Sequence, residues 1–326
     1  MPIRRQNVVT TWQRLAAASM PWMRPSRKGR RSVVSKSTVD REKVPPTEHD
    51  VLVDTGRWWN SVADTLFYNV EPRDEESIVE FKGMQGSIVC VWRDKKDAIQ
   101  YPDAHELLQE LGGQIEAIAV AGVGSSALGA AAFARDVAAG TGARAVAAVV
   151  SGTGMNDIVY EGLGGALFLR EDNQLEFWFE KLLHSLPSST LMPWLAPKLE
   201  TWDCIGCGPD VVTLKSLLRP RRLKNLKWVV GHSKGNLVIS SALSELWMEG
   251  ALERDHLADV NFVMLSAIVN LPPVGKPFQV IGALDGFGAM NSQPICPDRI
   301  VPGAWHHLNR AFPFHLDAVK ELATLR

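Results

Sequence analysis

The stretch Lys227-Trp-Val-Val-Gly-His-Ser-Lys-Gly-Asn236 decides how this chain is expected to fold. Its apolar residues 228–230 are typical of a short strand, and residues 237–247 carry apolar side chains on one helical face. A strand followed at once by a helix, with a serine between two glycines at the junction, predicts a sharp turn. Such a turn holds the serine hydroxyl above the end of a sheet.

The two glycines and the start of the helix indicate that this turn could form part of a catalytic site. Gly231 and Gly235 stand two residues either side of Ser233, in the pattern G-x-S-x-G, where a Cβ would clash with the neighbouring strand or helix. The helix would begin just after Ser233, so its N-terminal N–H groups would face the place where negative charge develops. The alternative is a surface strand–helix turn that happens to contain a serine.

Near-continuous apolar runs on both sides of this stretch predict a buried, mostly parallel sheet with helices on each face, which is an α/β fold. Upstream, a Gly-rich turn at 122–129 separates a strand from an Ala-rich helix that we expect to end at Gly140. The strands expected here are residues 116–121, 144–150, 260–265, 277–282 and 298–301. Only residues 266–276 join two of these strands, too few for a crossover helix, so we expect this edge to be built differently.

Further elements are expected near the two ends of the folded region. Strand-like runs at 77–81 and 87–92, joined by a glycine-containing segment, predict a hairpin. Helices are expected around residues 58–68, at 104–111, and from His307 to Leu325.

The alternation of strands and helices lapses between about residues 152 and 224. This stretch is rich in aromatic residues and proline in places, and it predicts a helical insertion of the lid or cap type. The alternative is a further layer of core helices. The chain would then comprise a basic, disordered tail at 1–50 and one domain at 51–326 that carries the insertion.

The N-terminal tail is strongly basic. Residues 1–39 contain nine Lys or Arg residues, and the first carboxylate is Asp40. Three interpretations stay open, which are a disordered tail, an organelle transit peptide, and a tail that makes weak contact with an anionic surface. A cytoplasmic location is expected, with organelle import through this segment as the alternative.

Composition and cysteine usage exclude several classes of protein. The 326 residues are 46% hydrophobic and 22% charged with a net charge of −1, as in soluble globular proteins, and we expect no nucleic-acid partner. No apolar run reaches the about 18 residues that span a bilayer. Cys204 and Cys207 form a lone CxxC without further zinc ligands nearby, so we expect a pair of structural thiols. Neither a metal nor a cofactor is expected.

A nucleophilic serine needs a base and a group that orients the base. Asp285 follows the strand at 277–282, and His306 and His307 follow the strand at 298–301. Because the carboxyl ends of parallel strands meet at one edge of a sheet, these side chains are expected near Ser233. The chain order is serine, aspartate, histidine, and His306 follows Asp285 by 21 positions.

This order and its strand contexts resemble the α/β-hydrolase superfamily over roughly residues 77–326. The resemblance implies Ser233 as nucleophile, Asp285 as orienting acid and His306 as general base. His306 is preferred to His307 because Pro302-Gly-Ala-Trp-His306 resembles the short loop that carries the family histidine.

The resemblance also implies an oxyanion hole made by the backbone N–H groups of Lys234 and Val123. Ala121-Gly-Val-Gly-Ser-Ser126 resembles the family's His-Gly-x-Gly-Ser-Ser loop, with Ala121 in place of the histidine. The Lys234 side chain is expected to face solvent. Gly122-x-Gly124 is also compatible with dinucleotide binding, but the third glycine is displaced and the next strand ends in Ser151-Gly152, without an acid to hold a ribose.

The function implied is two-step acyl transfer on a small-molecule ester or acyl substrate with an apolar group, as in a carboxylesterase or lipase. The same residues would serve a thioesterase, an amidase or an acyltransferase. A non-catalytic binding protein of the same fold is the alternative from another class.

Overall fold

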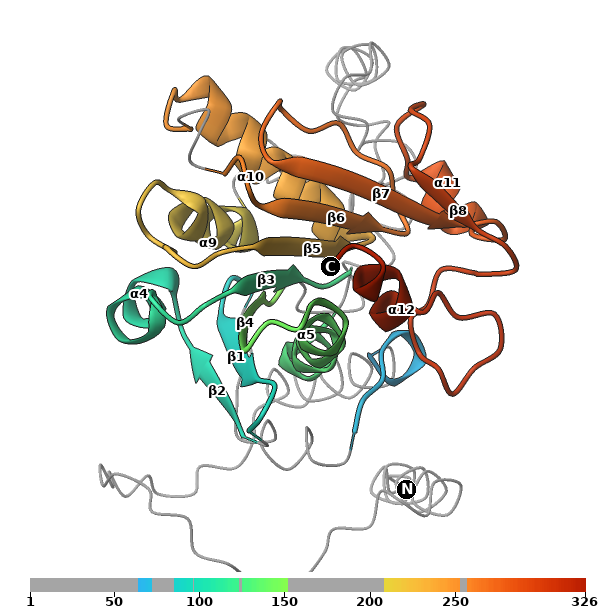
Figure 1. Ribbon diagram of the computed structural model, residues 1–326, viewed down its shortest axis with the longest axis horizontal. Coiled ribbons are helices and arrows are strands. Elements are labelled where there is room, and N and C mark those ends of the chain that lie inside the picture. The colour runs from blue at the N-terminus through green and yellow to red at the C-terminus, as the bar shows by residue number, and fades with distance from the viewer. Residues whose placement is uncertain (1–63, 72–84, 96, 123–124, 152–207, 253–256) are drawn as a thin grey trace, which may run out of the picture. The chain divides into compact units, whose positions relative to one another are not determined.

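The computed structural model describes residues 64–71, 85–95, 97–122, 125–151, 208–252 and 257–326 (Figure 1). The chain divides into two compact units, Met1–Pro46 and Thr47–Arg326, and every described residue lies in the second. The predicted basic tail, the predicted strand at 77–81 and residues 152–207 of the predicted insertion lie outside the described residues.

Eight strands form one mostly parallel sheet in the described part of the chain, in the order β2-β1-β4-β3-β5-β6-β7-β8. β1 is antiparallel to both β2 and β4, whereas all other neighbours are parallel. The α/β class expected from the sequence is therefore confirmed. The strands are β1 (Ile88–Trp92), β2 (Ala98–Tyr101), β3 (Ala117–Val120), β4 (Ala145–Val149), β5 (Trp228–His232), β6 (Asn261–Leu265), β7 (Lys276–Gly282) and β8 (Arg299–Val301).

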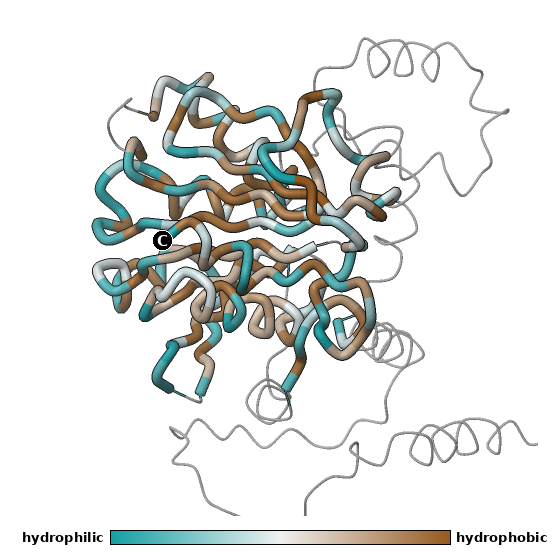
Figure 2. Tube along the Cα trace, turned by 45° about the vertical axis from the view of Figure 1, so that its right-hand side comes forward, coloured by the Kyte–Doolittle hydropathy of each residue, from teal (hydrophilic) through white to brown (hydrophobic). Residues whose placement is uncertain are grey.

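The central strands are apolar on both faces, and this gives the protein two core clusters. In β3, Ala117 and Ala119 belong to one cluster, whereas Ile118 and Val120 belong to the other. Successive side chains of a strand point to opposite faces, so a continuous apolar run can be buried only between two layers of helices. Figure 2 shows these hydrophobic runs along the centre of the sheet.

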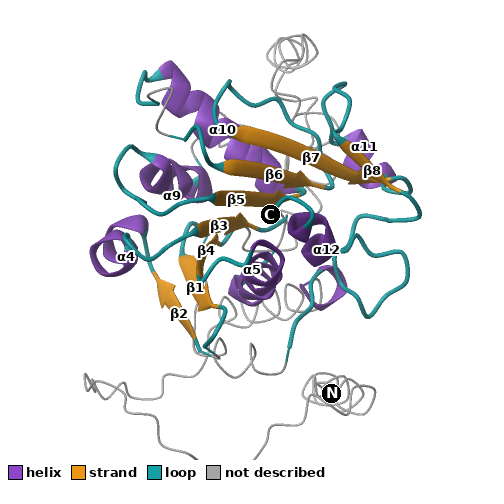
Figure 3. Ribbon diagram, in the orientation of Figure 1, coloured by secondary structure: helices purple, strands orange, loops and turns teal. Residues whose placement is uncertain are grey.

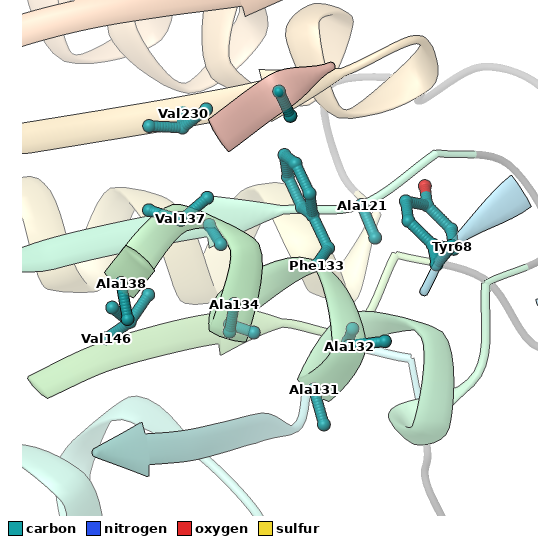
Figure 4. Packing of buried hydrophobic residues seen from close by; sticks show 14 of the residues in the cluster. Tyr68, Ala121, Ala131, Ala132, Phe133, Ala134, Val137, Ala138, Val146 and Val230 are labelled. Atoms are coloured by element: carbon teal, nitrogen blue, oxygen red, sulfur yellow. The ribbon is translucent and has the colours of Figure 1, made fainter. Parts of the chain in front are cut away.

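Helices cover both faces of the sheet (Figure 3). α5 (Ala127–Thr141) and α12 (Ala318–Ala323) pack on one face, and α4 (Ala104–Leu111), α9 (Pro209–Leu218) and α10 (Lys234–Met248) pack on the other. The alanines of α5 let its backbone approach the sheet closely, and Phe133 is the large side chain that fills the remaining space (Figure 4). The short α11 (Gly286–Met290) follows β7.

Two predicted helix boundaries were wrong. α5 passes Gly140 and ends at Thr141, with Gly142 at φ 74° as its cap. A Cβ on Gly140 would lie 2.7 Å from Cβ of Leu322, so this glycine allows α12 to pack against α5. The C-terminal helix begins only at Ala318, because residues 307–317 form a loop and the side chain of Asp317 caps the helix.

Part of the predicted insertion belongs to the core. Leu214, Leu217 and Leu218 of α9 are buried in the cluster that also contains residues of α10. α9 therefore belongs to a core layer, and any insertion ends before Pro209. Residues 266–275 join β6 to β7 without a helix, as the short connection predicted.

The described residues contain no helix that is both long and apolar enough to cross a membrane.

Candidate active site

Ser233 lies in the strained turn that the sequence predicted. β5 ends at His232 and α10 begins at Lys234, so Ser233 is the single residue between strand and helix, with φ 54° and ψ −119°. Positive φ is uncommon for a residue with a Cβ and persists only where the surrounding structure enforces it. A Cβ on Gly231 would lie 2.3 Å from Oδ1 of Asn236, which shows how tightly the turn is packed.

The structure brings Ser233, His306 and Asp285 together. Oγ of Ser233 lies 2.9 Å from Nε2 of His306, and Nδ1 of His306 lies 2.8 Å and 3.0 Å from the two carboxylate oxygens of Asp285. The three residues follow β5, β7 and β8, and all are buried. Side chains from the carboxyl ends of three parallel strands thus form one continuous chain of hydrogen bonds.

The Asp285 carboxylate determines which atoms donate and which accept in this series of hydrogen bonds. Its Oδ1 accepts the N–H of Gly288 at 2.6 Å, because Asp285 caps α11. An ionised carboxylate only accepts hydrogen bonds, so Nδ1 of His306 must carry the ring proton. In the neutral ring Nε2 then carries no proton and can accept the hydroxyl proton of Ser233, which is the arrangement that a general base requires.

His306 and His307 have different surroundings. Nε2 of His307 lies 3.1 Å from the carbonyl oxygen of Pro313, and its ring packs against Trp305 and Phe312. The His306 ring instead meets the edges of Phe67 and Phe287. Of the two candidate bases, only His306 makes a hydrogen bond with Ser233.

The two predicted oxyanion donors differ in what the structure shows. Lys234 is the first residue of α10 and directly follows Ser233, whereas Val123 lies outside the described residues. The prediction that the Lys234 side chain faces solvent was wrong. Its Nζ donates to the carbonyl oxygen of Ser151 at 2.9 Å and lies 3.9 Å from the buried carboxylate of Asp210. The carbonyl and carboxylate hold the ammonium group, which therefore stays largely buried.

Two residues of the site were missed by sequence reasoning. The hydroxyl of Tyr68 lies 2.9 Å from Nδ1 of His232, and Nε2 of His232 lies 2.9 Å from the carbonyl oxygen of His306. Burial lowers the pKa of His232 to about 3, so this imidazole is neutral. His232 belongs to the predicted motif, but no sequence pattern points to Tyr68, which lies 164 positions away.

The structure describes only some of the other features that the sequence predicted. Among the described residues, no group of three or more His, Cys, Asp or Glu side chains could hold a metal ion. Cys204, Cys207 and Gly124 lie outside the described residues, so the predicted thiol pair and the second glycine of the Gly-x-Gly turn are not seen.

No protein-family model matches this chain, and a search of curated proteins found no match.

Proposed function

We propose that this protein is a serine hydrolase of the α/β-hydrolase fold that cleaves an ester-like bond through an acyl-enzyme. One observation carries the proposal, namely the hydrogen-bonded series from Ser233 through His306 to Asp285, with Ser233 at positive φ in a strand-to-helix turn. Nucleophile, base and orienting acid recur in this arrangement on unrelated folds that perform acyl transfer. Within the proposal, residues 152–207 are the lid that contacts substrate.

The reaction would proceed in two steps. His306 takes the hydroxyl proton as Oγ of Ser233 attacks the carbonyl carbon, and Asp285 stabilises the imidazolium that forms. The N–H groups of Lys234 and Val123 would stabilise the oxyanion. His306 then protonates the leaving alcohol, giving the acyl-enzyme. In the second step His306 activates water, which releases the carboxylic acid and restores Ser233.

An apolar acyl or alcohol group is the substrate feature that we propose. Exposed apolar side chains stand next to triad residues in the chain, with Leu284 beside Asp285 and Trp305 beside His306. The same triad would serve a thioester or an amide, or would transfer the acyl group to an acceptor other than water. We place esters first because carboxylesterases and lipases act on substrates with such an apolar group, whereas the triad itself does not choose among these bonds.

Labelling with a fluorophosphonate probe tests the proposal. The wild-type protein should be labelled covalently, and Ser233→Ala should not. Ser216→Ala, which removes a hydroxyl from α9, is the matched control and should be labelled as well as wild type. A folded wild-type protein that resists labelling would favour the non-catalytic alternative. A chain-length series of p-nitrophenyl esters, compared with thioester and amide analogues, would then define the substrate class.

A further inference from the structure

A short helical segment upstream of the sheet contacts both ends of the turn that follows β3. The hydroxyl oxygen of Tyr68 accepts the N–H of Gly122 at 2.6 Å. Four residues earlier, the Asp64 carboxylate accepts the N–H of Ser126 at 3.1 Å and its hydroxyl at 2.5 Å. Asp64 and Tyr68 are 1% and 2% exposed, so these contacts form in a dry environment where they are strong. One segment thus holds both described flanks of the turn.

The first turn of α5 is shaped to admit the Asp64 carboxylate. A Cβ on Gly129 would lie 2.0 Å from Oδ1 of Asp64, so this position in an otherwise Ala-rich helix must be glycine. Ser126 is the N-cap of α5, and its hydroxyl oxygen accepts the N–H of Leu128. The carboxylate therefore lies at the N-terminal end of a 15-residue helix, whose dipole offsets part of the cost of burying its negative charge.

A second series of hydrogen bonds leads from Tyr68 to the histidine of the triad, and its direction can be deduced. A carbonyl oxygen only accepts, so Nε2 of His232 must donate to the carbonyl oxygen of His306. Nδ1 of the neutral ring is then unprotonated and accepts the hydroxyl proton of Tyr68. Tyr68 in turn accepts the N–H of Gly122. The hydroxyl of Ser266 makes a longer contact of 3.4 Å with the same His306 carbonyl.

We propose that residues 64–68, which we call the turn clamp, position Gly122 and Ser126 after β3 and, through His232, the main chain of His306. This inference rests on the proposed function. Tyr68 and His232 are positioning residues, because neither touches the hydroxyl of Ser233 in the hydrogen bonds of the described residues. Asp64 and Tyr68 lie on one helical turn, so a single element links the strand end after β3 with the loop after β8.

The turn clamp also explains how two imidazoles coexist beside one nucleophile. The His232 and His306 rings lie 5.2 Å apart, yet only His306 has an unprotonated nitrogen facing Ser233. A protonated His232 would present an N–H to Tyr68, whose hydroxyl proton would then lose its acceptor. Burial also raises the pKa of Tyr68, so its hydroxyl keeps the proton that it donates. His232 therefore stays neutral, and proton transfer is confined to His306.

Tyr68→Phe tests the turn clamp, with Tyr101→Phe as the matched control. Both tyrosines are buried, but Tyr101 lies in the edge strand β2 and its hydroxyl donates to Glu110 of α4. With a p-nitrophenyl ester, Tyr68→Phe should lower kcat by about tenfold or more and change KM by less than about twofold. Tyr101→Phe should leave both constants at wild-type values. Ser126→Ala, which removes a partner of Asp64, should lower kcat in the same way.

The results separate this inference from the proposed function. A wild-type protein that neither labels nor hydrolyses esters contradicts the function, whereas an active wild type with unchanged kcat in Tyr68→Phe contradicts the turn clamp alone. A spectroscopic test requires no activity and no variant. ¹⁵N chemical shifts should show His232 with a protonated Nε2 and an unprotonated Nδ1 from pH 5 to 8. The opposite tautomer, or titration of His232 within that range, would overturn the inference.

Discussion

The first turn of α10 packs directly on the end of β3, where a Cβ added to Gly235 would lie 2.0 Å from the carbonyl oxygen of Val120. A main-chain oxygen within the sheet cannot move aside cheaply. We therefore expect Gly235→Ala to displace the start of α10 and the Ser233 turn, lowering the free energy of unfolding by several kcal/mol and reducing kcat strongly. Gly113→Ala is the control, because no atom lies within 4 Å of a Cβ there. Urea unfolding and ester hydrolysis measure the two effects, and wild-type activity in Gly235→Ala would contradict the packing.

Asp285→Asn should reduce kcat by about three to four orders of magnitude, with a much smaller change in KM. The amide keeps the size of the carboxylate but carries no charge to stabilise the imidazolium of His306. Asp259→Asn is the control, because Asp259 is an exposed carboxylate that pairs with Lys276. Steady-state ester hydrolysis gives both constants. A loss of less than tenfold in Asp285→Asn would mean that another group orients His306.

His306→Ala and His307→Ala should behave very differently, although the two residues are neighbours in the chain. His306→Ala removes the base and should leave less than about a thousandth of wild-type kcat. His307→Ala removes a ring that contacts Pro313, Trp305 and Phe312 and should mainly lower the melting temperature. Comparison of kcat with thermal unfolding separates these roles. Retained activity in His306→Ala together with its loss in His307→Ala would reverse the assignment.

Two buried groups of the site should give opposite pH dependences of stability. Burial lowers the pKa of His232 from 6.5 to about 3. The contribution of His232 to the free energy of unfolding is therefore fully present above pH 6.5 and is lost as pH falls toward 3. Burial raises the pKa of Asp64 from 3.8 to about 7, so its contribution is fully present below pH 3.8 and is lost as pH rises through 7. Each effect is on the order of a few kcal/mol.

The two contributions partly cancel between pH 4 and 6.5 in the wild type, so variants are needed to reveal them. His232→Gln should remove the loss of stability on the acid side, leaving a protein whose free energy of unfolding falls as pH rises from 4 to 7. Asp64→Asn should do the reverse, and its stability should rise over the same range. Urea unfolding at several pH values measures both slopes. Parallel pH profiles for the two variants would contradict the assigned protonation states.

Features set by short-range patterns could be predicted from the sequence. The G-x-S-x-G turn depends on glycines within two residues of Ser233, and each central strand is visible as an apolar run. One further rule, that parallel strands end at the same edge of a sheet, placed Asp285 and the pair His306 and His307 near Ser233. The choice of His306 over His307 came from the resemblance of residues 302–306 to a family loop. In the structure, His306 lies at hydrogen-bonding distance from both Asp285 and Ser233.

The parts that could not be predicted depend on contacts between distant segments. The local sequence around Gly140 predicts a helix end, but in the structure this glycine leaves space for Leu322 of α12 to pack against α5. Lys234 reads as a surface residue, because Asp210 becomes its neighbour only in the folded chain. Tyr68 carries no motif, and its role depends on a hydrogen bond to His232 across 164 positions. In each case the pattern near the residue was compatible with several structures, and tertiary packing selected one.

The position of Lys234 has a consequence for which part of the chain could be exchanged. Its ammonium group contacts Ser151, which follows β4, and Asp210 in the first turn of α9, so these two residues on either side of the segment 152–207 lie close together. Joining two points that already lie together costs little extra entropy when the connecting segment is lengthened or exchanged. We therefore expect that residues 152–207 can be lengthened or exchanged without moving Ser233, Asp285 or His306.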